Sequence, residues 1–118
     1  MQTAKLQKIA VAALEDIKAH DIEVINTTKL TSLFDRIVIA SADSTRQVKA
    51  LARNVQEKIR EAGGEVIGVE GEEAGEWVLV DLGSVVVHVM QPAVRGYYNL
   101  EDLWKLTPAA KKKAATPA

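Results

Sequence analysis

The sequence predicts a single α/β (α+β) domain with a mixed sheet of about five strands and helices mainly on one face. Two stretches, 3–19 and 44–62, have apolar residues at the three- and four-residue spacing of amphipathic helices. Five shorter apolar stretches are typical of strands, and a glycine turn joins the last two. Because two long helices are too few to cover both faces of such a sheet, we expect one face to be partly open.

The first half of the chain is expected to contribute two strands between these helices. Residues 22–25 form a short apolar stretch directly after the first helix. Residues 34–40 contain three consecutive β-branched residues, which is typical of a strand covered on both faces, or at least of a central one. The polar residues between them, 26–32, are expected to form a loop or a single turn.

The second helix has both a start signal and a stop signal. Ser44 is followed three residues later by Gln47, which is the spacing of a capping box. Glycines 63 and 64 follow the last apolar residue, where a left-handed backbone conformation commonly ends a helix. The sequence therefore predicts a helix that begins after Ser44 and ends before Gly63.

The second half of the chain is expected to contribute three strands, over 65–69, 77–81 and 84–90. Pro92 follows the last strand and can begin a short helical turn. The apolar side chains within 100–104 form a small final apolar face. We expect this face to belong to the core rather than to an interface.

The hairpin of the last two strands determines which side chains share a face of the sheet. With a turn at 82–83, Asp81 lies opposite Ser84 and Trp77 lies opposite His88. One face then carries Val78, Val80, Val85, Val87 and Val89, and is expected to be core. The other face carries Trp77, Leu79, Val86, His88 and Met90. If it is uncovered, this second face forms an exposed apolar patch of the kind that marks binding sites. The alternatives are that the C-terminal segment covers Trp77, or that a one-residue slip exchanges the faces.

The charges of the chain are distributed unevenly. Residues 1–104 hold 11 Lys and Arg against 16 Asp and Glu, a net charge of −5, whereas the last fourteen residues hold four Lys and no acid. An acidic body argues against broad binding to nucleic-acid phosphates and favours a basic protein partner. We expect a domain over 1–106 followed by a disordered Lys/Ala/Pro tail over 107–118. The alternative for the tail is a weak contact with RNA.

No signature of an enzyme is found. The chain has no cysteine, which excludes thiol catalysis, iron–sulfur clusters and cysteine zinc sites. It also has no phosphate-binding glycine motif and no Asp-x-Asp in a strand. His88 is interpreted as structural or interfacial, and His20 as a partner of a helix dipole. We expect no catalytic residue, metal or cofactor. The N-terminal residues do not resemble a secretion signal and no apolar run could span a membrane, so we expect a cytoplasmic protein.

Several short motifs lie in order along residues 3–105. They are Asp21-Ile22-Glu23-Val24, Asp35-x-Ile37-Val38-Ile39-Ala40-Ser41, Ser44-x-Arg46-Gln47-Val48, the strand pair 77–90, and Arg95-x-x-Tyr98-x-Leu100-Glu101-x-Leu103-Trp104. Each motif is weak alone, but their order and spacing are specific. Together they resemble the ribosomal silencing factor, or Iojap, family. The lysine-rich tail lies outside the core shared by that family.

The resemblance implies a fold related to nucleotidyltransferases, although this sequence lacks the Gly-Ser and Asp-x-Asp elements of those enzymes. It also implies binding to the large ribosomal subunit through the large-subunit protein L-fourteen, on the face that meets the small subunit. A protein bound there blocks subunit joining and represses translation when nutrients are scarce. Some members of the family are dimers when free, through what is taken to be the same surface. A nucleotidyltransferase-like enzyme is the alternative function.

The candidate partner-binding residues come from the hairpin face, the acidic loop before it and the segment after it. They are Trp77, Leu79, His88, Met90, Arg95, Tyr98, Glu72, Glu73 and Glu76. Trp77 is expected to be the anchor, with the three glutamates pairing with basic residues of the partner. For Arg95 and Tyr98 the alternative, held equally, is that they attach the C-terminal segment to the sheet.

Overall fold

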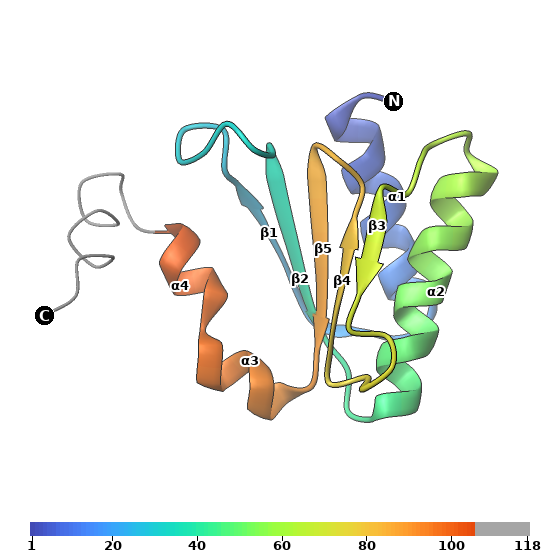
Figure 1. Ribbon diagram of the computed structural model, residues 1–118, viewed down its shortest axis with the longest axis vertical. Helices are drawn as coiled ribbons and strands as arrows, with labels where there is room; N and C mark the ends of the chain where they lie inside the picture. The colour runs from blue at the N-terminus through green and yellow to red at the C-terminus, as the bar shows by residue number, and fades with distance from the viewer. Residues whose placement is uncertain (106–118) are drawn as a thin grey trace, which may run out of the picture.

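A computed structural model of the chain describes residues 1–105 (Figure 1). In chain order the elements are α1 (Thr3–Asp16), β1 (His20–Asn26), β2 (Arg36–Ser41), α2 (Thr45–Glu61), β3 (Gly68–Glu70), β4 (Trp77–Asp81), β5 (Val85–Met90), α3 (Pro92–Tyr98) and α4 (Leu100–Lys105). The five strands form one sheet in the order β1-β2-β5-β4-β3. The β2–β5 pair is parallel and the other pairs are antiparallel, which confirms the predicted mixed sheet. The tail expected over 107–118 lies outside the described residues.

The two long helices, α1 and α2, cover one face of the sheet, and the short helices α3 and α4 lie on the other side (Figure 1). The main core lies under the long helices. It contains the valine face of the hairpin, whose members Val78, Val80, Val85, Val87 and Val89 are all fully buried. The prediction that this face is core is therefore confirmed. None of the helices in the part of the chain that is described is long and apolar enough to cross a membrane.

The start of α2 is built from the residues that the capping signal indicated. The hydroxyl of Ser44 accepts a hydrogen bond from the backbone N–H of Gln47 at 3.1 Å. The side chain of Gln47 accepts from the backbone N–H of Asp43 rather than from that of Ser44. Its amide also donates to the carbonyls of Ile17 and Lys18, both at 3.2 Å. One glutamine thus joins the start of α2 to the end of α1.

The first helix ends at Asp16 rather than at residue 19. Lys18 has a left-handed backbone with φ 60°, and its N–H donates to the carbonyl of Glu15. The N–H of Ala19 donates to the carbonyl of Leu14. These bonds are those of a Schellman ending, which closes the helix before the apolar pattern runs out.

The predicted register of the β4–β5 hairpin is wrong by two residues. Asp81 pairs with Val86, and Trp77 pairs with Met90. The turn residues are Gly83 and Ser84, with Gly83 at φ 92°, a conformation that glycine adopts without strain. Because side chains alternate with a period of two, a shift of two residues leaves every side chain on its predicted face.

The third strand is also shorter than predicted, covering only Gly68–Glu70. It is the edge strand beside β4 and pairs over three residues. The backbone N–H of Ile67 still donates to the carbonyl of Asp81, so the preceding residue follows the sheet without being part of the strand. The edge position gives β3 a single partner, β4.

Candidate protein-binding groove

The face of the sheet opposite α1 and α2 is only partly covered. A second apolar cluster on this face buries Ile25, Ile37, Ile39 and Met90. Phe34 from the β1–β2 loop and Leu100 and Trp104 from α4 pack against that cluster. The expectation of an open face is therefore correct only for the part over β4 and β5, because the C-terminal helices return over the rest.

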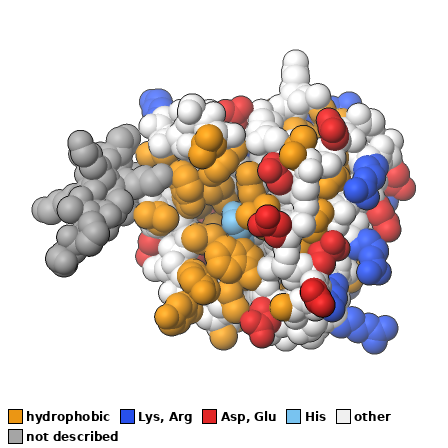
Figure 2. All heavy atoms as spheres, in the orientation of Figure 1, with side chains coloured by type: hydrophobic (Ala, Val, Ile, Leu, Met, Phe, Trp, Pro, Cys, Tyr) orange, Lys and Arg blue, Asp and Glu red, His pale blue; other side chains and the backbone are white. Residues whose placement is uncertain are grey.

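An apolar groove of about 520 Å³ remains between α4 and the hairpin. Its strand residues are Ile37, Val86, His88, Trp77, Leu79 and Asp81. Its opposite wall consists of Leu33, Phe34, Leu100 and Trp104. Figure 2 shows hydrophobic side chains gathered over this face with a histidine among them. We call this space the hairpin groove.

Four aromatic side chains form a row from the floor of the hairpin groove to the surface. Trp77 lies against His88 with ring centroids 5.9 Å apart and against Tyr98 at 4.9 Å. Tyr98 in turn contacts Tyr97 edge-on at 5.0 Å. The exposed fraction rises along this row from 7% at His88 to 55% at Tyr98 and 83% at Tyr97. Large aromatic side chains with one exposed side are typical of the anchors of protein interfaces.

Trp77 and His88 are also joined by a hydrogen bond. The indole Nε1–H of Trp77 donates to Nδ1 of His88 at 3.0 Å. An indole nitrogen can only donate, so Nδ1 is the unprotonated nitrogen and the neutral ring carries its proton on Nε2. Burial lowers the pKa of His88 to about 4, so the ring is neutral at pH 7. This pair is a fixed polar unit within an apolar surface.

The remaining predicted residues of the hairpin face divide into two groups. Trp77 and Leu79 are half-buried and line the groove, as expected of a binding surface. Met90 is only 1% exposed, so its predicted place on an accessible surface is wrong. It packs in the second cluster with Val94 and Leu100, which arrive from the C-terminal helices. The alternative that the C-terminal segment folds back is thus correct for Met90 and correct in part for Trp77, which contacts Tyr98 of α3 but stays half-buried.

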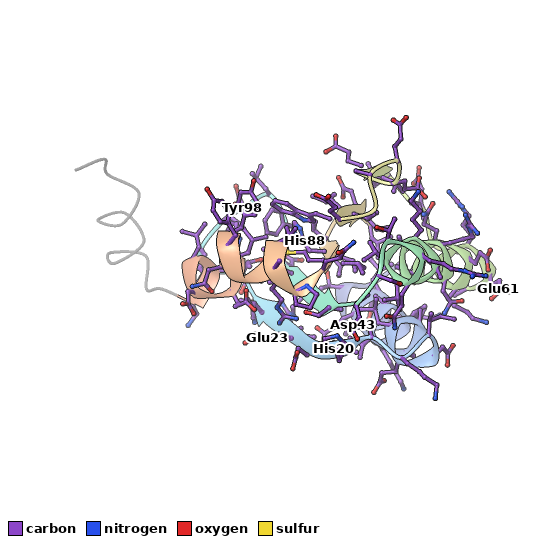
Figure 3. The ribbon with its side chains drawn as sticks, turned by 90° about the horizontal axis from the view of Figure 1, so that it is seen from below. His20, Glu23, Asp43, Glu61, His88 and Tyr98 are labelled. Carbon is purple, nitrogen blue, oxygen red and sulfur yellow. The ribbon has the colours of Figure 1, made fainter. Side chains whose placement is uncertain are left out.

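Arg95 attaches the C-terminal helices to the sheet. Its Nε donates to Glu101 at 2.7 Å, and Nη1 donates to the hydroxyl of Ser41 at 2.8 Å and to the carbonyl of Asp21. Nη2 lies 3.7 Å from a carboxylate oxygen of Glu23. In Figure 3 the labels of Glu23 and of Tyr98, the last residue of α3, lie on opposite sides of the α3–α4 ribbon. These contacts support the structural alternative for Arg95, whereas the exposed Tyr98 is free to meet a partner as well as to pack on Trp77.

The acidic loop before β4 lies beside the groove. Glu70, Glu72, Glu73 and Glu76 are all exposed. Glu70 lines a second hollow of about 330 Å³ together with Trp77 and Leu79, which also line the hairpin groove. The acidic neighbour of the predicted anchor in this hollow is thus Glu70, which was not among the predicted residues, and the contacts expected of Glu72, Glu73 and Glu76 stay a prediction.

His20 does not interact with the end of α1 as predicted. It begins β1, where its ring contacts Asp21 at 3.0 Å and Asp43 at 2.8 Å (Figure 3). These hydrogen bonds, first that of Asp21 and then that of Asp43, raise the pKa of His20. The bridge ties β1 to the residue preceding the cap of α2.

Sequence reasoning missed two exposed apolar side chains of this surface, Leu33 and Tyr97. Leu33 is 81% exposed at the rim of the groove, in a stretch that the sequence indicated only as the approach to a strand. The signal that could have found it is a leucine directly after the polar Thr31 and Ser32. Within residues 1–105, no group of three or more His, Asp or Glu side chains is placed to hold a metal ion.

Comparison with known proteins gives the family. A family model described as "Ribosomal silencing factor during starvation" matches residues 1–118. The chain belongs to the ribosomal silencing factor family. The ribosomal silencing factor RsfS of Chromobacterium violaceum is 60% identical over 104 residues, which cover 88% of this chain and 85% of that protein. The resemblance predicted from the sequence motifs is therefore confirmed.

A solved structure and a more distant relative are also similar to this chain. A crystal structure of a Chromobacterium violaceum protein with 60% sequence identity matches with a TM-score of 0.87, covering 88% of this chain and 87% of that one. The mouse "Mitochondrial assembly of ribosomal large subunit protein 1" is 34% identical over 99 residues, which cover 81% of this chain and 43% of that protein. The predicted α+β fold is thus also that of a solved relative.

Proposed function

We propose that this ribosomal silencing factor binds the large ribosomal subunit through the large-subunit protein L-fourteen. Bound on the face that meets the small subunit, it blocks subunit joining and represses translation when nutrients are scarce. Membership of the family supports a role as a silencing factor. The name of the mouse relative, which refers to assembly of the ribosomal large subunit, supports the choice of subunit.

The observation that carries the proposal is the hairpin groove with the acidic loop beside it. Trp77 and Leu79 belong both to the groove and to the hollow next to Glu70, so apolar and acidic contacts are available to one partner at once. Residues 1–104 carry 11 basic and 16 acidic side chains, a net charge of −5. An acidic surface attracts a basic protein over long range, and the apolar anchor then supplies affinity at contact.

The mechanism is steric and involves no turnover. A protein that occupies the surface where the subunits meet need only stay bound, so its strength as a repressor follows its dissociation rate. We also propose that it acts in the cytoplasm and that, when free, two copies pair through the same surface. Pairing would hide the exposed Leu33 and Tyr97 until a ribosomal subunit competes for them.

Co-sedimentation with isolated large and small subunits tests the proposal. The wild-type chain should bind the large subunit alone, and Trp77→Ala should weaken binding by about 2 kcal/mol or more, which is roughly thirtyfold. Glu61→Ala is the control, since Glu61 is exposed on α2 away from the groove. Thermal unfolding of each variant separates lost binding from lost folding. Binding to neither subunit, or normal binding by a folded Trp77→Ala variant, would contradict the proposal.

A nucleotidyltransferase activity is tested separately. Such an enzyme would transfer label from nucleoside triphosphates in the presence of magnesium. We expect no transfer by the purified chain, with or without large subunits. Saturable, metal-dependent product would replace the steric mechanism with a catalytic one.

A further inference from the structure

The floor of the hairpin groove contains one strongly buried polar ring, that of His88. The residue lies on β5 between Ile39 of β2 and Leu79 of β4, which are its direct cross-strand partners. It is 7% exposed and still lines the groove. Polar groups buried this deeply are normally hydrogen-bonded, so each of the two ring nitrogens is expected to have a hydrogen-bond partner.

Only one of the two ring nitrogens is paired within the described residues. Nδ1 accepts from the indole of Trp77, which places the ring proton on Nε2. No side-chain or backbone group in residues 1–105 accepts a hydrogen bond from Nε2. Nε2 is not fully buried either. Among residues 1–105, the only fully buried side-chain nitrogen or oxygen without a hydrogen-bond partner is Oε1 of Glu101. The Nε2–H of His88 therefore points into the hairpin groove.

We infer that His88 is a specificity-determining residue whose Nε2–H donates a hydrogen bond to an oxygen of the protein segment bound in the hairpin groove. The inference rests on the proposed function and names one contact within it. The bound segment is the part of the basic large-subunit protein that covers Trp77. Its acceptor is a backbone carbonyl or a side-chain oxygen that reaches between Leu79 and Val86, which also line the groove.

Selection follows from the cost of leaving a buried donor unpaired. A segment that covers the groove removes water from Nε2, so it must supply an acceptor or lose the hydrogen bond to solvent. The other strand residues of the groove are apolar except for Asp81, whose Oδ1 already accepts from the N–H of Gly83. A purely apolar segment of the same shape would therefore bind less tightly.

Trp77 contributes to this selection as a positioning residue. Its N–H pairs with Nδ1 and so keeps the proton of His88 on the nitrogen that faces the groove. The free protein provides a direct test, since nitrogen NMR of labelled His88 distinguishes the two tautomers. We expect a protonated Nε2 and an unprotonated Nδ1 near pH 7. A protonated Nδ1 would overturn the inference.

Two amide variants separate the two nitrogens in binding. His88→Asn can still accept from Trp77 at the position of Nδ1 but has no donor at the position of Nε2. His88→Gln reaches the position of Nε2 with an N–H but does not keep the acceptor near Trp77. Dissociation constants for isolated large subunits should therefore rise about tenfold for His88→Asn and clearly less for His88→Gln.

Each other result has a distinct meaning. One outcome is that His88→Asn binds as tightly as His88→Gln, or more tightly, while thermal unfolding shows that both variants are folded. That result would show that His88 acts only by holding Trp77. It would overturn this inference and leave the proposed function intact. Failure of the wild-type chain to bind large subunits would overturn the proposed function and this contact with it. Loss of self-association in His88→Asn with unchanged subunit binding would assign the donor to a second copy of the chain, which also overturns the inference.

Discussion

Trp77 and His88 are diagonal neighbours on the hairpin, and their hydrogen bond of 3.0 Å runs from the indole N–H to Nδ1. The residue directly opposite Trp77 is the buried Met90, and the residue directly opposite His88 is Leu79. The diagonal bond joins the half-buried Trp77 to the buried His88, and Tyr98 also contacts the indole, with its ring tilted by 48°. Aromatic side chains are long enough to reach a diagonal partner on an antiparallel pair.

Acid is expected to destabilise the protein through His88. Burial lowers the pKa of this side chain from 6.5 to about 4. Between those values the unfolded chain takes up a proton that the folded chain does not, so stability is full above about pH 6.5 and falls as the pH falls toward 4. The loss is on the order of 3 kcal/mol at about 1.4 kcal/mol per pKa unit. Urea unfolding at several pH values measures it, and His88→Asn should lose clearly less stability over this window.

His20 is expected to contribute with the opposite sign. Its hydrogen bonds to Asp21 and Asp43 raise its pKa, so the folded chain holds the proton more tightly than the unfolded chain. The resulting stability is fully present below about pH 6.5 and is lost as the pH rises through the higher folded-state pKa. Unfolding free energies of the wild type and His20→Asn should differ more at pH 6 than at pH 9. A difference that grows with pH would contradict this assignment. The effect is small because the side chains are exposed and screened.

Arg95→Met is expected to loosen the C-terminal helices. The substitution leaves the carboxylate of Glu101 buried without its cation and removes the bonds to Ser41 and to the carbonyl of Asp21. Breaking a largely buried ion pair from one side costs about 3–5 kcal/mol. The free energy of unfolding should fall by this amount, and proteolysis after residue 91 should become faster. Arg95→Met combined with Glu101→Gln is the matched control and should recover part of the loss. An unchanged stability in Arg95→Met would show that apolar packing alone holds these helices.

Reversal of the acidic loop is expected to slow binding to large subunits. The triple variant Glu72→Lys, Glu73→Lys and Glu76→Lys replaces three negative charges by three positive ones, a net change of +6, on side chains that are all exposed. The association rate should fall about tenfold at low salt, and salt should reduce the difference. The control, Glu57→Lys, Glu61→Lys and Glu65→Lys, makes the same change of net charge on exposed residues within and just after α2. Equal slowing in both variants would mean that net charge matters and the place of the loop does not.

The sequence by itself was sufficient for the features that depend on local pattern. Ser44 caps α2, and β4 covers the five residues from Trp77 to Asp81 that the sequence predicted. The valine face of the hairpin is buried although the register was predicted two residues out. Alternation along a strand and capping at a helix start are short-range effects, so they survive errors in how strands are paired.

Tertiary structure alone decided what covers the opposite face. Met90 is buried because α3 and α4 return across the sheet, held by Arg95 to residues of β1 and β2 that are far away in sequence. The Trp77–His88 bond likewise depends on the register of two strands. The composition and spacing of residues set which side chains prefer to be buried. Where the last helices dock, and therefore which part of an apolar face stays open as a groove, depends on long-range packing and on one arginine with several distant partners.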